Sequence, residues 1–174
     1  ELLDKGVTFA NLDNGDDDLG RFRDRIVGSY VYSGAYGYVE ALEAGCDIII
    51  SDRATDDAAI LAPLVHEFGW KWDDWDRLAV GILAGHLIEC GAACSGGITS
   101  LWKEVPEPWN IGYPIAEVNE RGELFITKVD GTGGLINRVT LTEHLLYEVQ
   151  DPGNYLMPEV ITDFTHVEME EVAK

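Results

Sequence analysis

DDWDRLAVGILAGHLIECGAACSGG, residues 73–97, predicts one buried helix that runs into a glycine-rich loop. Asp73 or Asp74 can cap the N-terminus of this helix, where a carboxylate also suits the positive end of the helix dipole. Gly81 and Gly85 lie four residues apart and therefore on one face. Because glycine lowers helix stability, this pair predicts that another backbone packs closely against that face.

The C-terminal end of the predicted helix carries a base, an acid and a thiol. His86, Glu89 and Cys90 are spaced by three and four residues, so they share one surface, and Gly91 is expected to end the helix in a left-handed turn. His86 and Cys90 could bind one divalent metal ion, with Glu89 as third ligand or general base. Without a metal, Cys90 could be a nucleophile that His86 activates. A purely structural helix, with the cysteine as a small hydrophobe, is the third interpretation.

Size and composition indicate an acidic folded domain. The 174 residues are enough for one domain with a full core, and the net charge of −20 disfavours nucleic acid and anionic membrane surfaces as partners. The 3 cysteines match no disulfide scaffold, which favours a reducing, cytoplasmic location. The sequence shows no membrane-spanning run and no signal peptide, and it lacks a starting Met, which suggests a fragment of a longer protein.

The order of the predicted elements indicates an α/β fold over residues 1–174, taken as a single domain. Helices at 33–44 and 56–68 flank the continuous apolar run CDIIIS at 46–51. Such a run is typical of a strand covered on both faces, so we expect a layered sheet that is at least partly parallel, with helices packed on it. The remaining elements are strands at 7–12 and 160–168, a small antiparallel hairpin of 115–118 with 124–129, and a helix at 141–149.

A second candidate site follows the apolar run 46–51. In open α/β sheets ligands bind at the carboxyl ends of the strands, and the next helix presents free N–H groups to anions. Arg53 offers a planar fork for a carboxylate or phosphate, and Asp56 could orient that fork or cap the helix.

The run DGTGG at 130–134 is a third, weaker candidate. Gly131, Gly133 and Gly134 could let backbone amides approach a phosphate closely, but no P-loop lysine follows and a tight turn is the simpler explanation. The other histidines are interpreted as structural or surface residues: His66, His144 and His166.

The chain contains these runs in order: 62–76 (APLVHEFGWKWDDWD), 84–92 (AGHLIECGA), 96–97 (GG), 110–117 (NIGYPIAE), 128–135 (KVDGTGGL) and 145–164 (LLYEVQDPGNYLMPEVITDF). Together they resemble the acyclic terpene utilisation family, the AtuA-like proteins. The likeness extends over nearly the whole chain from Gly6 onward, and it implies an inner piece of that family's large N-terminal domain. Arg53 and Asp56 match a Gly-Arg-x-x-Asp segment of the family.

The resemblance implies a cytosolic protein that takes part in catabolism of acyclic terpenes, a pathway of branched acyl-CoA thioesters. His86, Glu89 and Cys90 match the family's His-x-x-Glu-Cys-Gly run. Two segments depart from the family pattern. Residues 28–35 (GSYVYSGA) lack an expected asparagine, and Asp52 stands beside Arg53, where it would weaken the attraction for an anion.

The leading hypothesis is an enzyme of branched acyl-CoA or carboxylic acid catabolism that performs a lyase or hydratase step on a hydroxy-acyl-CoA. Arg53 and the glycine-rich amides would hold the anionic end of this small-molecule substrate, while His86 and Glu89 would move protons. This requires that His86, Glu89 and Arg53 open into one pocket. The alternatives are a non-catalytic subunit or scaffold for a pathway partner and a metal-dependent hydrolase, and a homo-oligomer is compatible with each.

Overall fold

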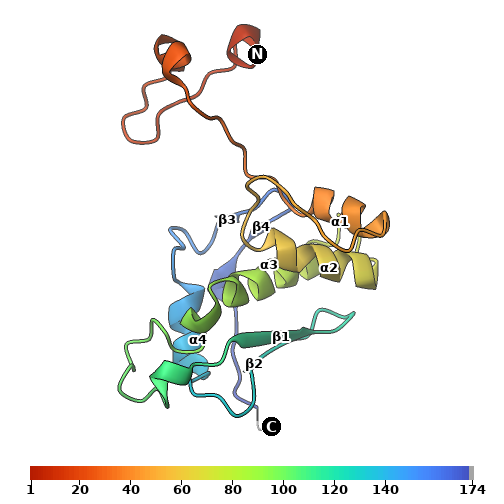
Figure 1. The fold of residues 1–174 in the computed structure, drawn as a ribbon, viewed down its shortest axis with the longest axis vertical. Coiled ribbons are helices and arrows are strands. Elements are labelled where there is room, and N and C mark those ends of the chain that lie inside the picture. The colour runs from red at the N-terminus through yellow and green to blue at the C-terminus, as the bar shows by residue number, and fades with distance from the viewer. Residues whose placement is uncertain (173–174) are drawn as a thin grey trace. The chain divides into compact units, whose positions relative to one another are not determined.

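The computed structural model describes residues 1–172, which divide by their internal contacts into two units (Figure 1). One unit is Glu1–Val31 and the other begins at Tyr32. In the part of the chain that is described, no helix combines the length and the apolar character that crossing a bilayer requires.

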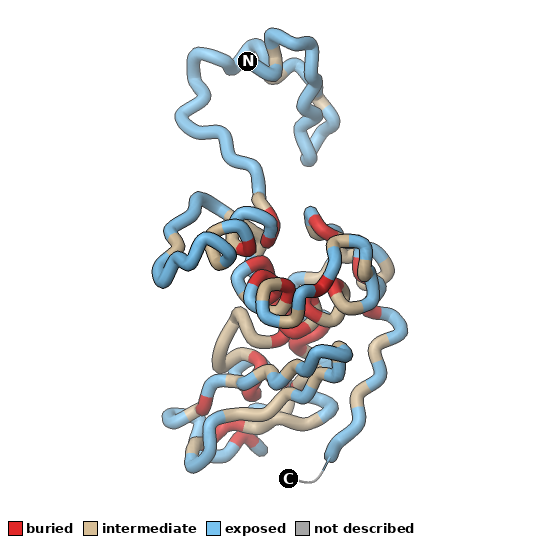
Figure 2. Tube along the Cα trace, turned by 90° about the vertical axis from the view of Figure 1, so that its right-hand side faces the viewer, coloured by how far each residue is buried: buried red, intermediate tan, exposed pale blue. Residues whose placement is uncertain are grey.

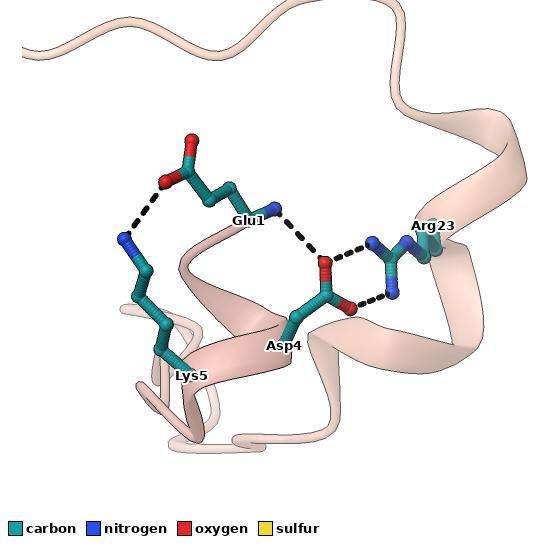
Figure 3. Close-up of polar contacts among 4 residues, drawn as sticks. All are labelled: Glu1, Asp4, Lys5 and Arg23. Atoms are coloured by element: carbon teal, nitrogen blue, oxygen red, sulfur yellow. Dashed lines mark hydrogen bonds and ion pairs between the residues drawn. The ribbon is translucent and has the colours of Figure 1, made fainter.

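The first unit is held by surface ion pairs and has no core. It contains the short 3-10 helices η1 (Leu3–Lys5) and η2 (Leu19–Arg25), and none of residues 1–31, all of which are described, is buried. Arg23 reaches both carboxylate oxygens of Asp4 at 2.6 and 2.8 Å (Figure 3). The prediction of a strand at 7–12 was wrong: this segment is exposed and forms no ladder, because a single strand without a partner is not stable.

The helices of the second unit follow local signals in the sequence. Asp74 is the N-cap of α3 (Trp75–Glu89) and its side chain accepts from the amide of Arg77, while Gly91 follows the helix with φ 56°. These features confirm the predicted cap and the predicted left-handed turn. The other predicted helices form as α1 (Tyr36–Glu43), α2 (Ala58–Phe68) and α4 (Arg138–Leu145), which starts three residues before the predicted 141 because Asn137 and Thr140 make a capping box.

The two glycines of α3 allow α2 to pack against it at close range. A methyl group added to Gly81 would clash with the side chain of Leu61, and one added to Gly85 would lie 2.7 Å from the Cα of Asp57. The prediction of a close backbone approach is therefore confirmed. Buried residues concentrate along α2 and α3, as Figure 2 shows in red, and Leu61, Leu78 and Ile82 are fully inaccessible to solvent.

The strands form two small antiparallel sheets. The predicted hairpin is confirmed, with β1 (Pro114–Val118) paired to β2 (Leu124–Lys128), and β3 (Tyr155–Leu156) pairs with β4 (Ile161–Thr162). The long strand expected at 160–168 was wrong: only Ile161–Thr162 pairs, and the 3-10 helix η5 (Phe164–His166) follows. The fold is thus a mixture of helices and strands.

The covered strand expected at 46–51 was also wrong. This segment has no strand assignment, and Ile48 and Ile50 are 81% and 93% exposed. Parallel pairing in the described residues is limited to isolated bridges, Ser33 with Ala54 and Ile111 with Gly133. An apolar run becomes a buried strand only where neighbouring strands and helices cover it, so the expected parallel layer does not form around these residues.

Candidate functional site

A pocket of about 420 Å³ opens where the segment before α2 meets β3. Its walls are mostly aromatic and aliphatic, with Thr55 and Asp56 as the polar members. The full lining is Tyr32, Thr55, Asp56, Tyr155, Leu156, Met157 and Pro158. A mostly apolar hollow with a few polar groups is the usual form of a small-molecule site.

Arg53 lies at the edge of this pocket and is bound to two of its lining residues. Its guanidinium carbon lies 5.1 Å from the ring centroid of Tyr32, and its Nη2 is 3.3 Å from Asp56 Oδ1. The Tyr32 hydroxyl, the Asp56 carboxylate and, more weakly, the Glu89 carboxylate raise the pKa of Arg53. Asp56 and Tyr32 therefore both contact the arginine, and the charge on Arg53 is permanent.

His86 is buried behind the pocket and does not line it. The side chain is 5% exposed, and its Nε2–H donates to the carbonyl of Leu145 at 3.0 Å. His144 returns this bond, because its Nε2–H donates to the carbonyl of His86 at 3.2 Å. Burial lowers the pKa of both imidazoles, so both are neutral at neutral pH. The expected structural role of His144 is confirmed by this reciprocal link between α3 and α4.

One aromatic ring separates His86 from the pocket. The ring centroid of Tyr155 lies 5.3 Å from that of His86, and Tyr155 also lines the pocket. Burial first, and then the negative charges of Asp57 and Asp56, raise the pKa of Tyr155. Its phenol is therefore protonated at neutral pH and can donate a hydrogen bond to a ligand.

Glu89 and Cys90 contact each other at the end of α3. The Cys90 thiol donates to Glu89 Oε1 at 2.7 Å. Burial, with the Glu89 carboxylate as the second cause, raises the pKa of Cys90 to about 12. The thiol is therefore protonated at neutral pH, which is unfavourable for the nucleophile interpretation because the thiolate is the reactive form.

A metal site at His86 and Cys90 does not fit the arrangement of their donor atoms. His86 Nε2 already donates to a carbonyl, and the Cys90 thiol is engaged with Glu89. Within residues 1–172, no three His, Cys, Asp or Glu side chains are grouped so that they could share an ion.

The DGTGG loop at 130–134 lies on the other side of α3 from the segment that joins α1 to α2 (Figure 1). The amide of Gly133 donates to the carbonyl of Asn110 at 2.9 Å, and that of Gly134 to the carbonyl of Pro106 at 2.8 Å. Gly131 and Gly134 have φ of 72° and 88°. The amides of Gly133 and Gly134 are already used within the protein, so the loop has the geometry of the tight turn that the sequence offered as the alternative to an anion site.

Beneath the pocket lies a group of buried polar atoms without hydrogen-bond partners. Asp57 is 1% exposed, and neither of its carboxylate oxygens has a partner among the described residues. The same is true of Thr55 Oγ1 and Glu159 Oε2. Burial raises the pKa of Asp57 to about 6, with the Glu159 and Asp56 charges as smaller contributions in the same direction; the nearby Thr55 hydroxyl lowers it but does not reach hydrogen-bonding geometry.

Comparison with known proteins identifies a family for the chain. The family model of the acyclic terpene utilisation family protein AtuA matches residues 1–174. The chain belongs to the AtuA family. The comparison with curated proteins and the comparison with solved structures each gave no match.

Membership in the AtuA family places the chain among proteins of acyclic terpene utilisation. The structure brings Arg53 and Asp56 together at the pocket, with Glu89 within electrostatic range, and it places His86 one ring away.

Sequence reasoning missed Asp57, Tyr155 and Glu159, and it placed Thr55 in the candidate run 51–56 without giving it a role. Asp57 stands next to the predicted Asp56 and is the N-cap of α2 although its side chain makes no cap hydrogen bond. Its place beside Asp56 was the one local feature of the sequence that pointed to Asp57. Tyr155 and Glu159 are about a hundred residues further along the chain, and only the fold brings Tyr155 to this AtuA pocket and Glu159 close to Asp57.

Proposed function

We propose that the chain is an enzyme of acyclic terpene utilisation that acts on a branched acyl compound, as its CoA thioester or free acid. The observation that carries this proposal is the mostly apolar pocket of about 420 Å³ with Arg53 at its edge. An apolar wall suits a branched hydrocarbon chain, and a guanidinium suits a carboxylate or phosphate. The exposure of Arg53, 55% for its side chain, leaves room for such an anion.

The reaction that we propose is a lyase or hydratase step on a hydroxy-acyl thioester. Such a step needs one group that removes a proton and one that donates a proton. Glu89 is the proposed base, and the protonated phenol of Tyr155 is a proposed donor to the thioester oxygen. His86 supports the site by holding the Tyr155 ring rather than by contacting substrate, because its own ring is buried.

One observation favours a non-catalytic subunit as the second candidate. Trp102, Trp109 and Tyr113 are 66%, 84% and 66% exposed, and aromatic side chains are enriched at protein–protein interfaces. A scaffold that binds another protein through these residues would require no turnover.

The test is turnover of a methyl-branched 3-hydroxyacyl-CoA, followed by the ultraviolet absorbance of the unsaturated thioester. Wild-type protein is expected to interconvert the two compounds. Arg53→Ala should raise KM about 10- to 100-fold, since a hydrogen bond to a charged group contributes about 1.5–3 kcal/mol.

Arg77→Ala is the matched control, because Arg77 pairs with Asp74 three residues away just as Arg53 pairs with Asp56. Its KM should equal that of the wild type. Absence of turnover in both directions, with no rise in melting temperature on adding the thioester, would overturn the enzymatic proposal.

A further inference from the structure

Unpartnered oxygens under the pocket require a physical explanation. A buried carboxyl or hydroxyl without a hydrogen bond costs about 1–3 kcal/mol, so native proteins keep few of them and often use them. Here Asp57, Thr55 and Glu159 each contribute such atoms, and the pKa of Asp57 responds both to Thr55 and to Glu159. These three side chains therefore lie in one polar cluster.

The backbone fixes this cluster in place. The carbonyl of Asp57 accepts from the amides of Ile60 and Leu61 at 3.0 and 2.9 Å, and Gly85 of α3 packs against its Cα. Thr55 is held by its own amide, which donates to the carbonyl of Ser33 at 2.9 Å. The backbones of Asp57 and Thr55 are therefore held in place, while their side-chain oxygens have no hydrogen-bond partner within the described residues.

Thr55 connects the cluster to the pocket. It lines the pocket, whereas Asp57 lies below it and is 1% exposed. A threonine hydroxyl has one proton to donate and two lone pairs to accept with. It can therefore donate its proton to a ligand oxygen while it accepts one from the protonated Asp57 carboxyl beneath, and it can pass protons the other way when Asp57 is ionised.

We propose that Thr55 and Asp57 form a proton relay that recognises the hydroxyl group of the acyl substrate. This inference rests on the proposed function and names the feature of the substrate that the pocket selects. Thr55 contacts the hydroxyl, and Asp57 acts through Thr55.

The step balances without any additional reactant. In the elimination direction Glu89 takes the proton from the carbon next to the thioester. The carbon–oxygen bond then breaks, and the leaving oxygen receives the Thr55 proton, which Asp57 replaces. The products are an unsaturated thioester and water, and in hydration each proton moves back.

The groups around Asp57 suit it for this role. Glu159 faces it from the segment between β3 and β4, Tyr155 from β3 and Asp56 from its own chain segment. The Oε1 atom of Glu159 itself accepts a hydrogen bond from the amide of Ala35 at the start of α1, which fixes the position of this carboxyl group. A pKa of about 6 lets Asp57 either hold or release a proton near neutral pH.

The experiment compares Thr55→Val, Thr55→Ser and Asp57→Asn on the 3-hydroxyacyl-CoA, with Thr142→Val as control because the Thr142 hydroxyl donates to its own helix. Thr55→Val and Asp57→Asn should each lower kcat about 10²- to 10⁴-fold, and Thr55→Ser should stay within about tenfold of the wild type. Asp57→Asn should also remove a limb with a midpoint near pH 6 from the kcat profile.

A saturated acyl-CoA without the hydroxyl separates recognition from damage to the fold. Its inhibition constant should be the same for wild type and Thr55→Val, whereas KM for the hydroxylated compound rises in the variant. An active wild type whose Thr55→Val form keeps its kcat, or whose Asp57→Asn form keeps the pH profile, overturns the relay alone. A wild type that turns over neither thioester overturns the proposed function, and the relay with it.

Discussion

The pKa values of two carboxyl groups, Glu143 and Asp57, shift in opposite directions because their surroundings differ. The Glu143 carboxylate accepts from the hydroxyls of Thr99 and Ser100 and from the Ser100 amide, and these bonds lower its pKa. The carboxylate oxygens of Asp57 are buried and make no hydrogen bond within the described residues, and this burial outweighs the nearby Thr55 hydroxyl and raises the pKa of Asp57 to about 6. Hydrogen bonds that favour the charged form and burial that disfavours it therefore act with opposite sign on similar groups.

Asp57→Asn should change how stability depends on pH. A carboxyl whose pKa is about 6 in the folded state and near 3.8 when solvated is protonated in both states at low pH. Between about pH 3.8 and pH 6 the unfolded chain has released this proton while the folded state still holds it, and above pH 6 the folded state must bury the charge. The free energy of unfolding of the wild type, relative to Asp57→Asn, should therefore fall by about 3 kcal/mol between about pH 4 and pH 7. Urea unfolding at several pH values measures this difference.

Glu143→Gln is the control with the opposite sign. The lowered pKa of Glu143 in the wild type means that this carboxylate stabilises the fold above the pKa it has in the unfolded chain, and that this stabilisation is lost as the pH falls. Comparison of each variant with the wild type cancels the effects of the buried histidines. A difference between wild type and Asp57→Asn that is constant across the pH range would show that Asp57 is solvated.

The thiol of Cys90 should react slowly with iodoacetamide. Its pKa of about 12 leaves almost no thiolate at pH 8, whereas Cys46 is exposed and should be alkylated first. Glu89→Gln should speed the alkylation of Cys90, since it removes the carboxylate that accepts from the thiol. Mass spectrometry of peptides after timed labelling measures these rates.

Cys94 is the internal control for that experiment. Burial raises its pKa to about 12 as well, and the replacement of Glu89 should leave its rate unchanged. Rapid alkylation of Cys90 in the wild type would restore the nucleophile hypothesis.

At the scale of elements, prediction from sequence succeeded where the signal was local. Asp74 and Gly91 mark the two ends of α3 by their own side chain or backbone, and α3 forms where these signals place it. The hairpin likewise follows from its turn at 119–123. The strand expected at 46–51 failed because a strand depends on partners elsewhere in the chain, which the run itself does not specify.

Replacement of the α3 glycines should separate two kinds of contact. Gly85→Ala places a methyl group against the backbone of Asp57, which cannot rotate away, so stability should fall by about 1–3 kcal/mol. Gly81→Ala meets only the end of the Leu61 side chain, and the helix gains about 1 kcal/mol from alanine, so its net loss should be smaller. Thermal and urea unfolding of both variants measure which of them loses more stability.

Gly37→Ala is the matched control within α1. An added methyl group there meets nothing within 4 Å, so this variant should be neutral or slightly more stable. Equal losses for Gly81→Ala and Gly85→Ala would contradict the close approach of α2 to α3 at Asp57.

At the scale of the whole molecule, the two units should differ in hydrogen exchange. Residues 1–31 include no buried residue, whereas α2 and α3 carry most of the buried apolar side chains. Amides of the first unit should exchange within seconds, and those of α2 and α3 should exchange most slowly. Deuterium labelling followed by mass spectrometry measures this, and slow exchange in residues 1–31 would contradict it.

The candidate site was only partly predictable, because it is assembled over long distances in the chain. Arg53 and Asp56 are three residues apart, and sequence alone linked them correctly to each other. Tyr155 and Glu159 reach the same place only through the packing of β3 and β4, and no short-range pattern shows that contact. The imidazole of His86 was predicted to face a ligand, but the reciprocal bonds with α4 turn it toward the protein.

Gly85 ties the geometry of the core to the chemistry above it. Because the Cα of Asp57 rests against this glycine, the distance between two helices also sets the depth of a carboxyl group under the pocket. Engineering of α3 for greater stability would therefore shift that carboxyl along with the helix. One displacement of the Asp57 carboxyl can therefore make a variant of this protein both more stable and less active.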